Sequence, residues 1–221
     1  MEKMIHKLQV IYHDIQLSQG EGRRLRGFFA NERQEGSLLH NHGVEGKDIY
    51  RYPLVQYKVL QNHPVVVALE EGIDVLYPLV MERETLLLAG REYPCGHTEI
   101  EWKETEIGDT DQIFHYSFRT PWFGLNQNNF ARYSRATDNE KQELLKHILI
   151  GNILSLSKGL GVKVERQLKL QTDLQPVSVS FKRETVLGFY GSFSVNYRIP
   201  NALGLGKSVS RGFGTVEREE T

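Results

Sequence analysis

Apolar residues recur every three or four positions over residues 18–31, where Leu25, Phe28 and Phe29 form one stripe. This spacing predicts a helix with one buried face. Short runs rich in apolar and β-branched residues predict strands before and after that helix. In the first half of the chain we predict strands at 7–12, 52–59, 64–69 and 85–89, and a second helix at 72–81.

The second half of the chain repeats this alternation of strands and helices. A polar stretch at 106–111 predicts a seam, and a helix is predicted from 138 to 157, ended by Gly159 and Gly161. Strands are predicted at 113–119, 162–170, 177–181, 189–197 and 213–217. The order βαββαβ is typical of a ferredoxin-like (RRM-like) domain. We therefore predict an α+β fold of two tandem ferredoxin-like domains, at residues 1–108 and 109–221.

The amino-acid composition bears on whether the chain is globular and on the compartment in which it works. With 39% hydrophobic residues, the 221-residue chain can form real cores. Its single cysteine, Cys95, excludes an internal disulfide and favours a reducing compartment. The first residues lack the apolar core of a secretory signal, and no apolar run approaches the roughly 20 residues that span a bilayer. We expect a soluble, cytoplasmic protein without a membrane partner.

Charge is unevenly distributed along the chain, although the net charge is only −1. Residues 61–111 contain three Lys or Arg against twelve Asp or Glu, whereas residues 151–214 contain nine against three. Either this is chance unevenness of a solvated surface, or anion binding is confined to one region. The second interpretation is favoured by a glycine-rich segment inside the basic region.

That segment, residues 204–214, consists of two glycine-apolar-glycine triplets around five residues with two cations and two hydroxyls. Glycine permits positive φ and close approach to backbone amides, and exposed amides beside Lys207 and Arg211 suit a phosphate backbone. The predicted phosphate-binding residues are Gly204, Gly206, Lys207, Ser208, Ser210, Arg211, Gly212 and Gly214. The plainer alternative is a mobile hairpin with solvated cations.

Two familiar phosphate motifs do not fit this segment. A Walker loop needs glycine where Asn201 stands, and a dinucleotide fingerprint needs glycine where Val209 stands. Both motifs also require a following helix, whereas the residues after Gly212 predict a short strand.

A second set of candidates is His40 and His42, followed by Lys47 and Tyr50. In an extended segment, histidines two positions apart point to the same side. Near neutral pH one imidazole can accept a proton while another donates one. When the ribose 2′-hydroxyl of RNA attacks the neighbouring phosphate, the cleavage needs a base, an acid and a cation. In principle these residues supply all three without a metal. Taken alone, the two histidines are better explained as ordinary polar loop residues.

Arginines on the first predicted helix complete the list of candidates. Arg23 and Arg24 lie largely outside its apolar stripe. Such residues usually form a solvated face, but here they could also line a groove for RNA.

The glycine-rich segment resembles the C-terminal signature of the CRISPR-associated repeat-processing endoribonucleases (the Cas-six family). Every position of that signature is matched, and Gly191, Ser192, Phe193, Asn196 and the pair Ile199-Pro200 resemble the residues that precede it. The paired histidines after the first helix resemble the b-type branch of the family.

This resemblance implies two ferredoxin-like domains and a metal-independent endoribonuclease without a cofactor. It implies cleavage within CRISPR repeats, with a cyclic phosphate and a 5′-hydroxyl as products. His40 and His42 would assist the 2′-hydroxyl, while Lys47 or Tyr50 would stabilise charge. The implied partner is repeat RNA in a precursor transcript, and an effector complex or a homodimer is also allowed. Two alternatives are a non-catalytic RNA-binding subunit of an effector complex and a general binder of nucleotides or other phosphate ligands.

Overall fold

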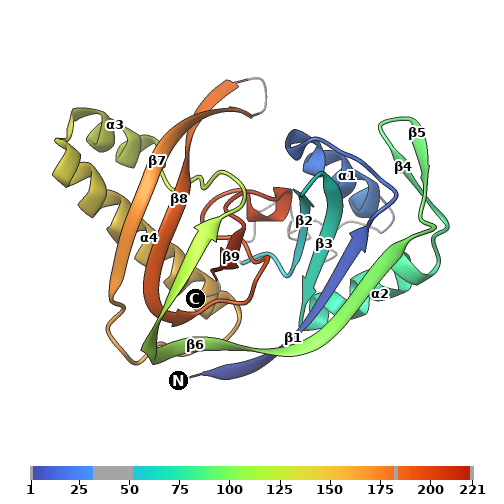
Figure 1. The fold of residues 1–221 in the computed structure, drawn as a ribbon, viewed down its shortest axis with the longest axis horizontal. Coiled ribbons are helices and arrows are strands. Elements are labelled where there is room, and N and C mark those ends of the chain that lie inside the picture. Colours follow the sequence, from blue (N-terminus) through green and yellow to red (C-terminus); the bar gives the residue numbers. More distant parts are fainter. Residues whose placement is uncertain (1, 32–51, 182–183, 220–221) are drawn as a thin grey trace, which may run out of the picture. The chain divides into compact units, whose positions relative to one another are not determined.

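The computed structural model describes residues 2–31, 52–181 and 184–219, except for the side chains of residues 30 and 31. The chain forms two compact units (Figure 1). The N-terminal unit consists of Met4–Thr105 together with Ser210–Gly212. The C-terminal unit consists of Met1–Lys3, Glu106–Val209 and Phe213–Thr221.

The N-terminal unit has a sheet in the order β2-β3-β1-β6 and two helices. Its elements are β1 (Lys3–Tyr12), α1 (Gly22–Asn31), β2 (Val55–Leu60), β3 (His63–Leu69), α2 (Glu71–Met81), β4 (Thr85–Leu88), β5 (Arg91–Pro94) and the first part of β6 (Thr98–Phe118), up to Thr105. The strand β3 pairs antiparallel with both β1 and β2. A two-residue turn joins β2 to β3, with positive φ at Gln61 and Asn62, as expected of a tight hairpin.

The core of this unit lies between the sheet and its helices. Leu8, Val10 and Tyr12 alternate along β1, and they belong to one buried cluster with Leu25 and Phe29 of α1. The predicted apolar stripe of the first helix is therefore confirmed. A short 3-10 turn (Gln19–Glu21) precedes α1 and begins with a capping box between Ser18 and Glu21.

The strand predicted at 85–89 forms as β4, but its expected place in the N-terminal sheet is wrong. It does not close that sheet, because β4 pairs with β5 in a separate two-stranded sheet. Positive φ at Ala89 and Gly90 forms the tight turn between these two strands. The strand beside β1 is instead β6, whose first residues are mostly polar and largely exposed, as is usual for an edge strand.

The C-terminal unit repeats the same strand order, with the second part of β6, from Glu106 on, as its first strand. Its sheet runs β9-β6-β8-β7, and every neighbouring pair is antiparallel. The elements that follow β6 are α3 (Gln127–Arg135), α4 (Asp138–Gly159), β7 (Leu170–Phe181), β8 (Glu184–Arg198) and β9 (Val216–Arg218). Both units thus have the ferredoxin-like strand order, and the predicted α+β class is confirmed.

Helix α4 packs its apolar face on the C-terminal sheet. Leu145, Leu149 and Ile153 are buried, and the Ser157 hydroxyl donates to the Tyr197 hydroxyl of β8 at 2.8 Å. Where a ferredoxin-like domain has its second helix, the residues between β8 and β9 form the glycine-rich segment, with one 3-10 turn at Val209–Arg211.

The strand predicted at 162–170 is wrong, since β7 begins only at Leu170. Side chains satisfy the backbone of the preceding residues in place of a strand partner. The Asp109 carboxylate accepts hydrogen bonds from the backbone of Glu165 and Arg166. The Asn196 side chain accepts from the Lys169 amide and donates to the Gln167 carbonyl. The polar stretch 106–111 lies within β6, which continues through it with a register shift between Asp109 and Phe114.

Candidate nucleic-acid interface

The two glycine triplets of the segment 204–214 lie side by side. Gly204 forms an antiparallel bridge with Thr215, and the Leu205 amide donates to the Gly214 carbonyl at 2.8 Å. Leu205 is fully buried. These contacts fix both ends of the segment within the C-terminal unit.

Glycine is required where the segment meets its surroundings most closely. Gly206 has φ of +87°, and a Cβ there would lie 2.6 Å from Trp122 Nε1 and 2.9 Å from the Phe123 carbonyl oxygen. At Gly214, φ is +65° and a Cβ would lie 2.0 Å from the Leu205 carbonyl oxygen. A side chain at either position would combine a disfavoured backbone with a steric clash.

Lys207 is held by the protein at two atoms. Its amide donates to the Phe123 carbonyl at 3.0 Å, and its Nζ donates to the Leu125 carbonyl at 3.0 Å. Partial burial lowers the pKa of Lys207 from its usual value. Because an ammonium group has three donors, the bond to Leu125 leaves Lys207 able to bind an anion as well.

The middle of the segment, Ser210–Gly212, belongs to the N-terminal unit. Gly212 has φ of +89°, and a Cβ there would lie 2.7 Å from the Tyr57 carbonyl oxygen and 3.1 Å from Lys58 Cα. The Arg211 carbonyl oxygen would lie 3.3 Å from a Cβ at Gly22, the first residue of α1. Arg211 is therefore placed beside the start of α1 and next to β2.

Cations gather in this part of the N-terminal unit. Burial, and after it the charge of Arg211, lowers the pKa of Arg26 on α1. Burial, and after it the charge of Lys7, lowers the pKa of Lys58 to about 7. The Lys58 Nζ donates to Gln56 Oε1 at 2.8 Å. Lys7 and Lys58 are buried, and burial disfavours the charged form of Lys58, whereas Arg211 is only half-buried.

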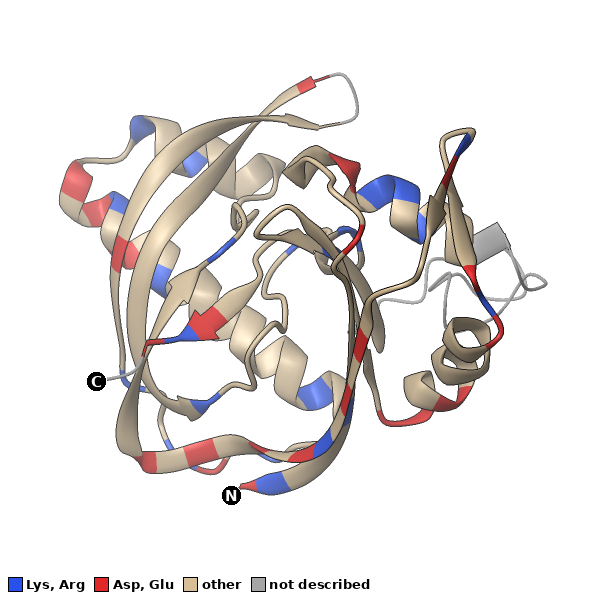
Figure 2. Cartoon of the chain, turned by 45° about the vertical axis from the view of Figure 1, so that its right-hand side comes forward, with Lys and Arg blue, Asp and Glu red and all other residues tan. Residues whose placement is uncertain are grey.

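Figure 2 shows the contrast between cationic α1 and α2, whose charged residues are acidic. The predicted RNA-binding residues Arg23 and Arg24 are both exposed on α1. Arg24 forms an ion pair with Glu21, one turn earlier. Within the described ranges, Arg23 has no ion-pair partner.

The candidate catalytic residues His40, His42, Lys47 and Tyr50 lie outside the described residues. Within the described part of the chain, no group of three or more His, Cys, Asp or Glu residues is placed to hold a metal ion. Across those same residues, no helix has the length and apolar character needed to cross a membrane.

Sequence reasoning did not predict the residues that hold the glycine-rich segment in place. Fully buried Trp122 donates from Nε1 to Asn152 Oδ1 on α4 at 3.0 Å, and the Thr120 hydroxyl accepts from the Thr215 amide at 2.8 Å. The only signal was the apolar triplet at 121–123 directly after a strand, which indicates burial but not its partner.

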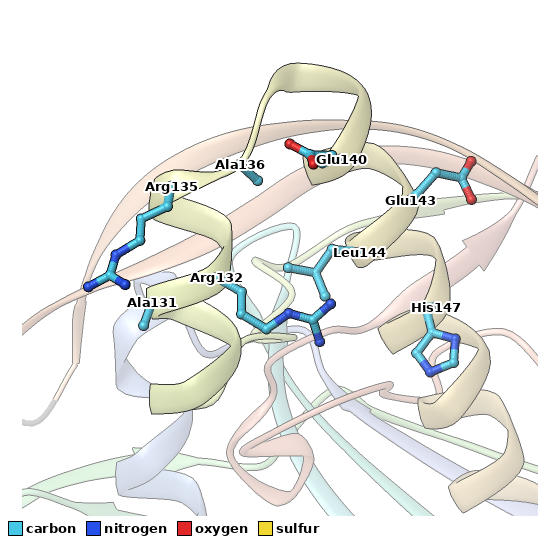
Figure 3. A pocket seen from close by; sticks show the side chains of 8 residues that line it. All are labelled: Ala131, Arg132, Arg135, Ala136, Glu140, Glu143, Leu144 and His147. Carbon is cyan, nitrogen blue, oxygen red and sulfur yellow. The ribbon is translucent and has the colours of Figure 1, made fainter.

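A groove of about 740 Å³ lies between α3 and α4 (Figure 3). Arg132 extends from α3 toward α4 on the side where His147 lies. Glu140 and Glu143 line the same groove, and Glu140 accepts hydrogen bonds from Thr137 at the start of α4. The mixture of cations and carboxylates makes this groove less suited to a phosphate than the glycine-rich segment.

A distant relative among the solved structures shares the fold of this chain. At 12% sequence identity and a TM-score of 0.54, the chain matches a solved CRISPR-associated protein Cas6 over 99% of its length and 100% of that chain, a likeness of fold alone. Both proteins have the same architecture of two ferredoxin-like domains.

Closer matches define the family. The Cas6b N-terminal domain model matches residues 3–106, and the Cas6b C-terminal domain model matches residues 108–219. The chain belongs to the Cas6b family. It is 34% identical to a crystal structure of Cas6b, with a TM-score of 0.93, over 98% of this chain and all of the other. The resemblance drawn from the glycine-rich segment is thus confirmed.

Two further relatives were found. One is a crystal structure described as the CRISPR RNA processing endoribonuclease Cas6b, which is 32% identical with a TM-score of 0.82, over 98% of this chain and 100% of that one. The other is an uncharacterized protein of Methanocaldococcus jannaschii, which is 38% identical over 143 residues, or 64% of this chain and 97% of that protein.

Proposed function

We propose that this protein is an endoribonuclease that cuts CRISPR repeat RNA in precursor transcripts and so releases guide RNAs. The observation that carries the proposal is the full-length likeness to Cas6b, including a structure described as a CRISPR RNA processing endoribonuclease. The cations and glycines of the segment 204–214 support it, because they suit the phosphate backbone of RNA.

The proposed chemistry uses the nucleophile that RNA itself carries. The ribose 2′-hydroxyl attacks the adjacent phosphate in line, and the bond to the departing 5′ oxygen breaks. Of His40 and His42, one removes the proton from the 2′-hydroxyl and the other protonates the leaving oxygen. Lys47 or Tyr50 stabilises the charge that develops on the phosphate. The products are a cyclic phosphate and a 5′-hydroxyl, and the reaction needs no metal ion.

The proposed RNA contacts are separate from these catalytic groups. Lys207 and Arg211 bind backbone phosphates, assisted by the glycines and by Ser208 and Ser210 of the same segment. Arg23 and Arg24 extend this interface along α1. Phosphate contacts of this kind set affinity and its salt dependence rather than base preference.

Single-turnover cleavage of repeat RNA tests the catalytic assignment. His40→Ala and His42→Ala should each slow cleavage by a factor on the order of 10²–10⁴ while RNA affinity stays nearly unchanged. His147→Ala removes an exposed histidine of α4 and serves as the matched control. If both variants cut at the wild-type rate, the catalytic site lies elsewhere. If the wild-type protein binds repeat RNA tightly but never cuts it, the non-catalytic subunit is the correct function.

A further inference from the structure

A second concave site lies wholly within the C-terminal unit at the start of β7, with residues of α4, β6 and β8 in its lining. Its volume is about 680 Å³, which is in the range of small-molecule sites. Its polar lining consists of His115, Lys146, Gln167, Lys169, Gln171 and Ser194. None of the described residues that line it is acidic, in contrast to the groove between α3 and α4. We call this site the lysine pocket.

The two lysines of the pocket retain charge for a ligand. Lys146 lies 3.5 Å from Glu143, a surface ion pair between a half-exposed ammonium and an exposed carboxylate. Such pairs hold their partners only weakly. The backbone of Lys169 is fixed by Asn196, while its exposed side chain has no ion-pair partner within the described ranges. Two cations without a carboxylate in the lining favour an anion such as phosphate.

Polar side chains form a row across the sheet at this pocket. Gln171 of β7 is paired with Ser194 of β8, and Ser194 is paired with His115 of β6. Directly paired residues present their side chains on the same face of a sheet, and this row lies on the face opposite to the buried Phe114, Val195 and Leu170. An amide, a hydroxyl and an imidazole together offer donors and acceptors for the edge of a nucleobase.

An exposed apolar residue completes the site. The register of β6 shifts between Asp109 and Phe114, and Ile113 lies in this irregular stretch with 47% of its surface exposed. Irregularities of this kind redirect side chains beside functional sites. Ile113 and Ile150 of α4 both line the pocket. A flat nucleobase can pack on such apolar side chains.

We propose that the lysine pocket binds one nucleotide of the repeat RNA, with its phosphate at Lys146 and Lys169 and its base against Ile113 and the polar row. This inference rests on the proposed function, and it adds a nucleotide-binding site outside the glycine-rich segment. The shared chemistry is that of a nucleoside phosphate, so a free nucleotide is the alternative source that the experiment must separate.

Binding of an uncleavable repeat RNA, with deoxyribose at the cut site, tests the pocket independently of catalysis. The Lys146→Ala/Lys169→Ala variant should raise Kd about tenfold at physiological salt, and its salt slope should fall by about 0.7 for each phosphate that the variant no longer binds. The matched control is Lys141→Ala/Lys163→Ala, which removes two lysines of the same unit that are each paired with a carboxylate. This control should bind like the wild type.

A second variant tests the base contact. Ile113→Ala should weaken binding without changing the salt slope, because no charge is removed. Wild-type affinity and slope in the double lysine variant, or an equal loss in the control, would overturn the proposal. Ribonucleoside 5′-monophosphates are then titrated alone. Micromolar binding that the double lysine variant loses, with unchanged RNA binding, would assign the pocket to a free nucleotide. Absence of cleavage by the wild type would instead count against the proposed function alone.

Discussion

Replacing Gly206 with alanine should destabilise the C-terminal unit, because the segment 204–214 packs against Trp122 and Phe123 at this position. The new Cβ would lie 2.6 Å from Trp122 Nε1 and 2.9 Å from the Phe123 carbonyl oxygen. To relieve these contacts, one of two groups must shift. One is the Trp122 indole, which donates a hydrogen bond to Asn152, and the other is the Phe123 carbonyl, which accepts a hydrogen bond from the Lys207 amide. The perturbation therefore affects the support of the segment as well as its backbone.

The expected loss in the free energy of unfolding of Gly206→Ala has three contributions. Alanine at a φ of +87° costs about 1–2 kcal/mol relative to glycine. Overpacking of a buried contact typically costs about 1–3 kcal/mol. Loss of the hydrogen bond between Trp122 and Asn152 adds about 1 kcal/mol. Because the neighbours relax in part, we expect a net loss of about 3 kcal/mol, or about 6–12 °C in the unfolding temperature of a chain of this size.

Thermal unfolding followed by tryptophan fluorescence measures this loss, and Gly151→Ala is its matched control. Gly151 lies within α4 of the same unit, and a Cβ there would meet nothing within 4 Å. The same substitution should therefore stabilise the protein by about 1 kcal/mol, through helix propensity. Equal stability of Gly206→Ala and wild type would refute the claim that close packing requires glycine at this position.

Three further predictions concern charge. Burial lowers the pKa of Lys58 to about 7, so the unfolded chain holds one more proton between pH 7 and pH 10. In urea unfolding, Lys58→Met should therefore be more stable than wild type at pH 7, and its advantage should shrink toward pH 10. An advantage that stays constant over this range would contradict the lowered pKa. Burial alone would raise the pKa of Asp109, but hydrogen bonds to its carboxylate outweigh it and lower the pKa to about 2. The Asp109 carboxylate therefore contributes about 2 kcal/mol to the free energy of unfolding above pH 4, and this contribution is lost as the pH falls toward 2. In urea unfolding at a series of pH values, Asp109→Asn should match the wild type only at the acid end. A difference that does not depend on pH would count against the lowered pKa. Lys207→Ala and Arg211→Ala should weaken RNA binding and flatten its salt dependence, with less effect on cleavage at saturating protein; unchanged salt slopes in filter binding would argue against phosphate contacts.

Elements with a clear apolar pattern were predictable from the sequence. Helix α1 buries a periodic apolar stripe, and β3 is a continuous apolar run that is buried, so the pattern carries their structure. The first part of β6 was missed because its larger apolar residues, Ile100 and Trp102, are exposed on an edge strand. The start of β7 was misplaced because Asp109 and Asn196, distant in sequence, bind the backbone that precedes it.

The glycine-rich segment was predictable as a feature, but its packing partners were not. Its glycines marked a backbone that needs positive φ, and Gly206, Gly212 and Gly214 all have it. Nothing local to the segment indicated that Trp122 would enclose Gly206, or that Gly212 would pack on Tyr57. Those partners lie far away along the chain, and only the folded structure brings them together.

Incubation with the repeat RNA of the protein's own host in the presence of EDTA is the sharpest test of the proposed metal-independent cleavage. We expect cutting at one position within the repeat, with a 5′-hydroxyl and a cyclic phosphate at the new ends. The same RNA with deoxyribose at that position should bind but stay intact, since it lacks the attacking 2′-hydroxyl. Cutting that stops in EDTA and returns with magnesium, or that proceeds on the deoxyribose substrate, would contradict metal-independent attack by the 2′-hydroxyl.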